Sequence, residues 1–437
     1  MSNFNPELTI SKVEPELERG PVWLREKRKT AAESFNAAPL PRRGLHLWRY
    51  TDPTRFMFET SVDTAKVGDG FAKVEEIEKQ HLADGHLSGL VVDFAGREIT
   101  VHGQEALQAK GVVVTSLSAA TFEYTELVEK HLYSLVNSQT GKFEAMNGAL
   151  WNDGVFIYVP DGVTVEKPIH LLREAGMAGS AQYPRLLVVA DKNAELTIVD
   201  EYGGGSADLK NGVSYSNGAV EIFGDEDSRV RYVSLQRQGP GMHSYLTHRA
   251  KIARGATMLT IPLAFGGILS KQNFGVNLAG QGADSNMFGL LFGSKRQHFD
   301  NHTLHHHSSG QTHSNIDFKV VLRDKAISAY TGLIAIDEKA QTCEAYQENR
   351  NLLLNKGTRA ETIPELEILN EDVSCSHGAT VGPIDPYMLF YLKSRGIEHD
   401  KAVRMIVSGF VEATLSMVPA DLRERIGEFV ETRLEDI

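Results

Sequence analysis

Apolar and polar residues alternate through the middle of the chain, from residue 151 to residue 382. The alternation recurs in segments such as KNAELTIVDEY, SRVRYVSLQ and RGATMLTIPLA, most of which follow a small or turn-forming residue. A period of two places successive side chains on opposite faces of a β-strand. Turn signals recur at intervals of roughly 25 to 35 residues, a spacing that suits solenoids whose coils stack strand on strand. The pattern predicts a mainly β chain with a β-helix core over residues 151–382.

Glycines mark the expected corners of this core. Gly162, Gly218, Gly255 and Gly357 supply the backbone freedom that a corner needs. Three consecutive glycines, residues 203–205, lack the G-x-G-x-x-G spacing of a dinucleotide site and predict a loop. The same strands would also suit a β-sandwich or a jelly roll, because these architectures use similar alternating strands.

The residues before the core show a different pattern of apolar and polar positions. Trp23, Leu24 and Arg28 lie at helical spacing and predict a helical arm, and a proline-punctuated linker follows at residues 39–53. Residues 74–136 mix short strand-like and helix-like segments, which is typical of an α/β or α+β unit. We therefore expect residues 1–150 to form an N-terminal helical or mixed region.

Helical spacing returns after Pro383. A segment begins at Asp385 and ends near Gly396, and the next one places apolar residues on or near one face before Pro419 interrupts it. We expect a C-terminal helical domain over residues 383–437, whose apolar stripes serve internal packing or, less often, a partner. The stripes comprise Ala402, Ile406, Phe410 and Leu415 in the longer segment, and Leu422, Ile426, Phe429, Val430 and Leu434 in the last.

Composition and charge narrow the class of protein. The 437 residues are 41% hydrophobic and 23% charged, with a formal net charge of -12. This balance argues against a general affinity for nucleic acid or for anionic membranes, since both need clustered Lys and Arg. Two cysteines, Cys343 and Cys375, are too few for a disulfide framework or for a self-sufficient four-cysteine cluster. Without a signal-like start or an apolar run near ~18 residues, we expect a cytoplasmic, non-secreted protein.

Six histidines lie close together and suggest metal binding. Neutral imidazoles bind zinc, iron and copper. In a strand, however, His305 and His307 share one face while His306 points to the other, so at most two of the triplet converge. The spacing therefore favours a stack of hydrogen-bonded histidines over a metal site. The six are His298, His302, His305, His306, His307 and His313.

A second candidate is the pair Cys375 and His377. In an extended backbone these two residues face the same way, and a soft thiolate beside an imidazole suits iron or zinc better than magnesium or calcium. Two ligands do not complete a site. Either a second chain contributes the rest, or the pair is a buried thiol beside a hydrogen-bonded histidine. A Cys/His nucleophilic dyad is less favoured, because no orienting Asn or Asp is identifiable.

Other chemistry finds less support. No G-x-x-x-x-G-K-[ST] motif occurs, so the chain is not expected to hydrolyse ATP through a P-loop. Many β-helix proteins process polysaccharides with carboxylates along a groove, and that enzyme class is the main rival. The stretch ELEILNEDVSCSH contains acidic residues that such an enzyme could use, but charges of this kind more often form a solvated face. They are Glu365, Glu367, Glu371 and Asp372.

Three long segments resemble the SufB/SufD family of iron–sulfur cluster assembly scaffolds. They are KFEAMNGALWNDGVFIYVPDGVTVEKPIHL from Lys142, ENRNLLLNKGTRAETIPELEILNEDVSCSHGATVG from Glu348, and DPYMLFYLKSRGI from Asp385. Looser similarity extends through HHSSGQTHSNIDFK and the run WRYTD at residues 48–52, so most of the chain is covered. Within the family the sequence is most similar to the SufD type.

The resemblance implies both a fold and a set of partners. It implies a right-handed parallel β-helix between an N-terminal helical region and a C-terminal helical domain. It also implies a non-catalytic scaffold subunit that pairs with SufB through its β-helix core, while its C-terminal helices dock the SufC ATPase. ATP hydrolysis would then belong to SufC. An isolated chain could instead form a homodimer.

The resemblance further implies a site. The Cys-x-His pair of SufD lies near the SufB interface, and here it matches Cys375 and His377 as ligands of a nascent, transient iron–sulfur cluster. SufB-like members carry a cysteine in the preceding rung, where this chain has Asn349, Arg350 and Asn351. This difference favours the SufD type and argues against sulfur acceptance by this chain alone. Reduced flavin is associated with the family complex, but no flavin fingerprint is present here.

Overall fold

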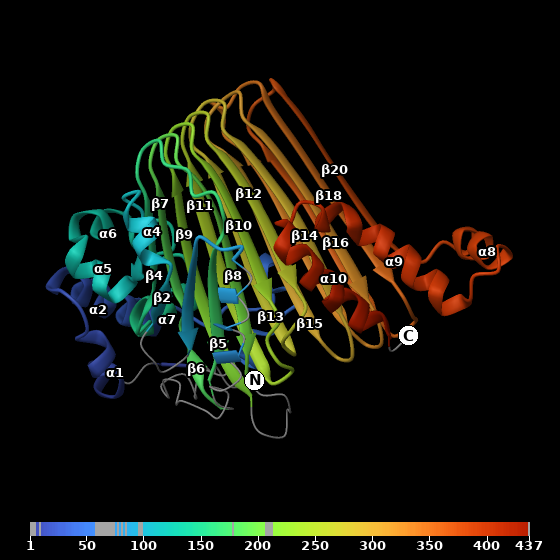
Figure 1. Cartoon of the computed structure of the whole chain (residues 1–437), viewed down its shortest axis with the longest axis horizontal. Coiled ribbons are helices and arrows are strands. Elements are labelled where there is room, and N and C mark those ends of the chain that lie inside the picture. The colour runs from blue at the N-terminus through green and yellow to red at the C-terminus, as the bar shows by residue number, and fades with distance from the viewer. Residues whose placement is uncertain are drawn as a thin grey trace.

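The computed structural model describes residues 6–7, 10–56, 75–76, 78–79, 82–83, 85–94, 99–176, 179–205 and 213–435. Its centre is a parallel β-solenoid (Figure 1). The predicted β-helix core is therefore confirmed, and the alternative β-sandwich and jelly roll are excluded. Within these residues the strands form two sheets of ten strands each.

The two sheets run the length of the solenoid and enclose its core. The first sheet contains, in spatial order, β2 (Thr100–His102), β1 (Gly89–Phe94), β5 (Ile169–Ala175), β8 (Glu195–Gly204), β10 (Arg229–Gln236), β12 (Thr257–Ala264), β14 (Asp284–Gly293), β16 (His313–Leu322), β18 (Cys343–Leu353) and β20 (Val373–Pro383). The second contains β19 (Arg359–Ile368), β17 (Ile327–Ile336), β15 (His298–His307), β13 (Leu269–Leu278), β11 (Met242–Ile252), β9 (Ser214–Gly224), β7 (Arg185–Ala190), β4 (Gly154–Val159) and β3 (Val113–Ser116), with β6 (Ala181–Gln182) beside β9.

Neighbouring strands from β8 to β20 in the first sheet pair in parallel with little shift. Paired residues there lie between 27 positions apart, as in Thr257 and Asp284, and 34 positions apart, as in Glu195 and Arg229. This interval matches the spacing of the turn signals in the sequence. Because the register barely drifts, inward side chains of successive coils stack in ladders. One such ladder runs through Val188, Ile222, Ala250, Val276, His305, Ile334 and Leu366.

The corner prediction holds for only some of the glycines. Gly162 and Gly255 occupy turns at φ of 71° and 66°, a backbone region that side chains with a Cβ rarely adopt. Gly218 lies inside β9 and not at a corner, so that prediction was wrong. The predicted loop at residues 203–205 is also wrong in part, because β8 continues to Gly204. There the absence of side chains admits Arg237 and Glu174, which a Cβ on Gly203 would strike.

Helices cover the start of the solenoid. They are α1 (Ile10–Leu17), α2 (Val22–Ala37), α4 (Gln104–Gln108), α5 (Leu117–Glu123), α6 (Thr125–His131) and α7 (Lys142–Leu150), with short 3-10 turns η1 (His46–Trp48) and η2 (Pro53–Arg55). The predicted helical arm is α2, which packs on the wholly buried α7. The predicted mixed unit starts at residue 74, which lies outside the described residues, and its described strand β1 extends the first sheet through β5.

Three helices follow the last strand: α8 (Pro386–Ser394), α9 (His399–Leu415) and α10 (Ala420–Glu435). The Asp385 side chain accepts the N–H of Tyr387 at 2.8 Å and starts α8, as the sequence predicted. Helices α9 and α10 lie along the outer face of the first sheet, whereas α8 projects away from it (Figure 1). The buried stripe of α9 is Val403, Val407 and Val411, so the predicted Ile406 and Phe410 lie at its half-buried margin.

Candidate functional site

The final coil of the solenoid, formed by β19 and β20, is open. These strands end their sheets, so each has one neighbour strand among the described residues, β17 for β19 and β18 for β20. Within the two strands no residue is fully buried, in contrast to the strands of the preceding coils. Unpaired N–H and C=O groups of an edge strand are a template for a further strand. The end of the solenoid is therefore a surface that another chain could extend.

Cys375 and His377 both face the inner side of this coil. In the ladder between β18 and β20, Cys375 pairs with Ala345 and His377 pairs with Gln347, and both partners are buried. The sequence prediction that the two residues share one face is thus confirmed. Cys375 is half-buried, whereas His377 is exposed at the mouth of the coil. The arrangement places a thiol and an imidazole side by side at an opening.

The environment of Cys375 keeps its thiol neutral. It packs against the buried cluster that contains Cys343, Ile334 and Ala345. Burial raises the pKa of the Cys375 thiol, and the nearby Cys343 acts in the same direction. Because only the thiolate binds metals well, Cys375 needs an approaching cation to release its proton.

Cys343 lies one coil deeper and is 1% exposed. Its sulfur is 3.1 Å from the hydroxyl of Thr312 and 3.4 Å from the carbonyl oxygen of Ala340. The hydroxyl and the carbonyl hold the thiol inside the core, so Cys343 is a structural residue in this conformation.

The inner histidines of the cluster at residues 298–313 are part of the core. Because β15 is a strand, His305 and His307 share one face, as predicted, and the structure shows that this face is the inner one. His305 lies 3.1 Å from the hydroxyl of Ser285, while His307 contacts the hydroxyls of Thr312 and Ser314 at 2.7 and 2.9 Å. Burial lowers the pKa of His305 to about 3 and that of His307 to about 4. These rings are neutral and already hydrogen-bonded.

Each of the two outer histidines of the cluster pairs with a different aspartate. His306 pairs with Asp337 and His313 with Asp284, both at 2.8 Å, on the surface. Nowhere in the described part of the chain do three His, Cys, Asp or Glu side chains gather as a metal site would require. The structure therefore supports the stack of hydrogen-bonded histidines that the spacing favoured.

His298 and Lys271 hold the N-terminal linker against the second sheet. His298 lies 3.0 Å from the hydroxyl of Thr51, and burial lowers the pKa of His298 to about 4. His302 and the ammonium of Lys271 both contact Asp300, and Lys271 also donates to the carbonyl oxygen of Leu47 at 2.6 Å. Burial would raise the pKa of Asp300, but Lys271 and His302 bring it below its usual value.

A buried carboxylate that sequence reasoning missed connects α10 to the first sheet. Glu201 of β8 is fully buried and accepts from Arg425 of α10 at 2.8 and 2.9 Å. His170 lies 2.8 Å away on the same carboxylate, which Arg237 also contacts. Burial alone would raise the pKa of Glu201, but these three partners hold it well below its usual value. No periodic pattern marks such a contact, since the partners lie up to 224 positions apart.

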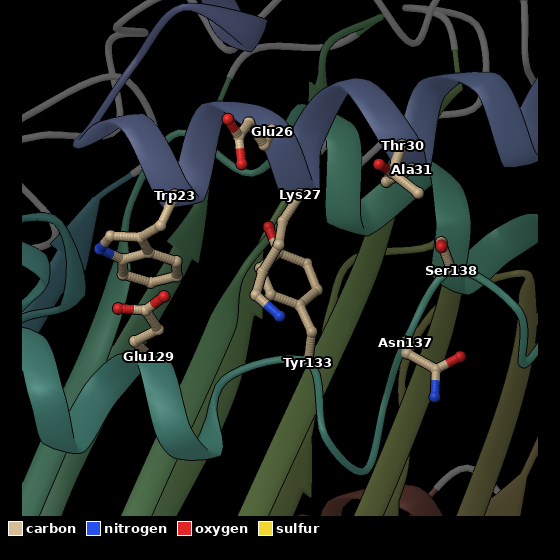
Figure 2. Close-up of a pocket in the computed structure, with 9 residues that line it drawn as sticks. All are labelled: Trp23, Glu26, Lys27, Thr30, Ala31, Glu129, Tyr133, Asn137 and Ser138. Carbon is tan, nitrogen blue, oxygen red and sulfur yellow. The ribbon is translucent and has the colours of Figure 1, made fainter.

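Two cavities lie away from the final coil, one lined by residues between Trp23 and Ser138 and the other by residues between Leu127 and Gly280. One of about 420 Å³ opens between α2 and the segment after α6, where Figure 2 shows Trp23 beside Glu129 and Lys27 in front of Tyr133. The Lys27 ammonium lies 5.9 Å from the centre of the Tyr133 ring and so fills part of this space with a cation of the chain itself. A second cavity of about 650 Å³ adjoins His131. Neither cavity is lined by Cys375 or His377.

The acidic stretch that could have served a polysaccharide enzyme makes ordinary surface contacts. Glu365 pairs with His46 at 3.1 Å, and Asp372 accepts from the hydroxyl of Thr342 at 3.1 Å. These contacts engage two of the four acidic side chains in surface interactions, as a solvated face would.

Helix α8 exposes a continuous apolar surface. Tyr387 and Phe390 are 84% and 71% exposed, and Met388 and Tyr391 are more than half exposed. No residue of α8 is buried. Exposed apolar patches of this kind mark sites where another protein binds.

Two family models together span most of the chain. The SufBD core domain of the SUF iron–sulfur cluster assembly system matches residues 172–410, and the SufBD N-terminal region matches residues 18–171. The chain therefore belongs to the SufBD family of iron–sulfur cluster assembly proteins. No helix in the described ranges is long and apolar enough to cross a membrane.

Similar proteins align along nearly their whole length. An iron–sulfur cluster assembly SufBD family protein of Staphylococcus epidermidis is 27% identical over 434 residues, which is 98% of this chain and 91% of the relative. The iron–sulfur cluster assembly protein SufB of Bacillus subtilis is 27% identical over 426 residues, 95% of this chain and 90% of the relative. This full-length similarity favours the scaffold class over a polysaccharide enzyme or a histidine-cluster metal protein.

Proposed function

We propose that this chain is a SufD-type, non-catalytic scaffold subunit that helps to build iron–sulfur clusters in the cytoplasm. The observation that carries the proposal is the placement of Cys375 and His377, side by side at the open end of a SufBD-family solenoid. The SufD type is favoured over SufB because residues 349–351, where SufB-like members carry a cysteine, hold none in this chain.

The donor set requires a second subunit. Protein-bound iron–sulfur clusters usually have four protein ligands, most of them thiolates. Here Cys375 and His377 supply one thiol and one imidazole, and Cys343 is held inside the core. SufB would supply the remaining ligands across the junction. His377 then acts as ligand or proton acceptor for the nascent cluster, and Cys375 assists once iron displaces its proton.

Strand β20 is the better edge for pairing with SufB. It carries no Asp, Glu, Lys or Arg, whereas β19 carries Arg359, Glu361, Glu365 and Glu367. Charged side chains protect an edge from pairing, and their absence leaves β20 open to a further strand. The same edge would let an isolated chain pair with a second copy of itself when SufB is absent.

The apolar surface of α8 would receive the SufC ATPase. A helix that buries none of its residues in its own chain needs another surface to cover Tyr387 and Phe390. ATP binding that draws the SufC subunits together would pull on α8 to α10 and, through them, on the first sheet. The motion is ATP-dependent only if nucleotide binds the closed state more tightly.

Anaerobic co-expression with SufB and SufC tests the proposal. We expect a stable complex whose iron and sulfide content falls several-fold in His377→Ala, because an exposed imidazole ligand is lost without disturbing the core. His313→Ala, another histidine at the surface of the first sheet, serves as the matched control and should keep the cluster. Unchanged iron and sulfide in His377→Ala would remove the assigned role of this residue.

A further inference from the structure

The floor of the candidate site is a buried amide. Gln347 lies beside His377 in the ladder between β18 and β20 and is 2% exposed. On the other side, the ladder between β16 and β18 places Ile316 next to Gln347. Ile316 is fully buried and offers no polar atom in its side chain. Of its two ladder neighbours, therefore, only His377 can hydrogen-bond the amide.

The orientation of the amide is fixed from across the core. The Gln347 Nε2 donates to the carbonyl oxygen of Gly332 at 3.1 Å. A Cβ on residue 332 would lie 2.4 Å from that nitrogen, so only glycine allows the amide to reach this carbonyl. With Nε2 engaged, Oε1 cannot exchange places with it, and Oε1 has no hydrogen-bond partner in the described structure.

A buried acceptor without a partner is unfavourable, and a neighbouring donor relieves it. No hydrogen bond of the His377 ring occurs with any described residue, and the ring is exposed, so it is free to turn inward. Histidine ligands generally donate their second ring N–H to a carbonyl or carboxylate, which fixes the tautomer and the orientation of the ring. A carboxamide oxygen at this rung is such an acceptor.

We propose that Gln347 is a positioning residue for His377: its Oε1 accepts the Nδ1–H of the His377 ring and leaves Nε2 unprotonated at the mouth. The ligand role of that Nε2 rests on the proposed function, whereas the hydrogen bond itself does not. Nδ1 is the ring nitrogen nearer the backbone and the one suited to a neighbour in the ladder. The hydrogen bond holds the ring in the form that can bind iron.

Nitrogen chemical shifts of the isolated chain test the hydrogen bond. The chain is labelled with 15N-histidine, and the His377 signals are those missing from His377→Ala. Spectra are taken at alkaline pH, because only the neutral form of an imidazole has two distinct tautomers. We expect one dominant tautomer, Nδ1–H, in the parent chain.

Gln347→Met, which has nearly the same shape but no acceptor, should lose this preference. Gln272→Met is the matched control, because Gln272 is also a buried glutamine whose Oε1 lacks a partner, but it adjoins Leu246 and Asn301 instead of His377. If Gln347→Met folds poorly, Gln347→Asn, whose amide is one methylene shorter, replaces it. An unchanged tautomer in these variants, or the absence of a dominant tautomer in the parent, would overturn the positioning role.

The assembled complex separates this inference from the proposed function. We expect Gln347→Met to weaken iron retention roughly 10- to 100-fold, the range found when a partner of a metal-binding histidine is removed. If His377→Ala keeps its cluster while the tautomer depends on Gln347, the hydrogen bond stands and the proposed function fails. If His377→Ala loses its cluster while the His377 tautomer is unchanged in the Gln347 variants, the positioning role fails and the proposed function stands.

Discussion

Single residues in this chain take their character from the coil in which they lie. Cys343 and Cys375 lie on adjacent strands of the same sheet, yet one is enclosed by Thr312 and backbone carbonyls while the other reaches the open end. Likewise His305 and His377 both face inward, but only His377 is exposed. Position along the solenoid therefore decides whether a chemically capable side chain is enclosed in the core or reaches the open end.

Buried His305 should make stability depend on pH. Its pKa is lowered to about 3 by burial, against roughly 6.5 when unfolded. Its stabilising contribution is complete above the unfolded value and is lost as the pH falls from there toward the folded value. Between pH 7 and pH 5, His305→Gln should lose about 2 kcal/mol less free energy of unfolding than the parent.

Urea unfolding at the two pH values measures this difference. A His305 variant that tracks the parent across this range would show that its ring gains a proton as easily in the folded chain as in the unfolded one.

The sequence predicted which residues form the candidate site, but not which buried residues surround them. The two-residue spacing of Cys375 and His377 was enough to place them on one face. The Gln347 floor was not visible, because the register that aligns residue 347 with residue 377 depends on the length of the intervening turns. The histidine cluster was ambiguous in the sequence because any metal site would have needed ligands from another coil.

At the scale of elements, α10 is attached to the solenoid by both apolar and charged contacts. Leu422, Ile426 and Val430 pack against the outer face of the first sheet. At the same interface Arg425 binds Glu201, which also retains His170 and Arg237. Because His170 and Arg237 stay with the carboxylate, releasing α10 does not leave the buried charge of Glu201 unpaired.

Removing the helix side of this ion pair should therefore cost less than removing the carboxylate. We expect Arg425→Ala to lower the free energy of unfolding by about 1–2 kcal/mol, and Glu201→Ala by about 3–5 kcal/mol, since the latter removes the buried carboxylate that Arg425, His170 and Arg237 share. Arg425→Ala should also speed amide hydrogen exchange in α10 before the rest of the chain opens.

Chemical denaturation and hydrogen exchange check both expectations. Lys401→Ala, which removes an exposed cation from neighbouring α9, should change neither measurement. Equal losses for Arg425→Ala and Glu201→Ala would mean that His170 and Arg237 do not sustain the carboxylate when α10 leaves.

The helices show where periodicity suffices and where it fails. The apolar stripes of α9 and α10 were predictable, although the buried face of α9 centres on Val407, one position beyond the predicted Ile406. Helix α7 gave no stripe because every one of its residues is buried, from Lys142 to Leu150. A helix enclosed on all sides has no polar face to set its period.

At the scale of the whole molecule, the solenoid is covered at one end and open at the other. Helices and the antiparallel strand β3 adjoin its start, whereas β20 is an edge without charged residues. The sequence predicted the coils and their interval, because each coil repeats the same local pattern. It did not reveal which end is open, since that depends on where the flanking helices pack.

The open edge of β20 offers a test of pairing that spares the fold. In a parallel ladder, the N–H and C=O of one residue point to the same neighbouring strand, and successive residues alternate. The N–H of Glu344 bonds to Thr312 on the β16 side, so Ala345 and Gln347 point to β20. In β20 the hydrogen-bond partners of Ala345 and Gln347 are the even-numbered residues on either side of Cys375 and His377. The N–H of Thr380 therefore points toward β18, whereas the N–H of Ala379 points to the free edge.

Ala379→Pro should therefore remove one donor from the pairing edge while keeping every bond to β18, because proline lacks an N–H and is tolerated at edges. We expect the variant to keep the thermal midpoint of the parent within a few degrees yet to lose most co-purification with SufB. Thr380→Pro, one residue away, deletes a bond to β18 and should lower the midpoint. If Ala379→Pro binds SufB as the parent does, the two chains meet through a surface other than the edge of β20, and the ligands that complete the Cys375 and His377 site must come from elsewhere.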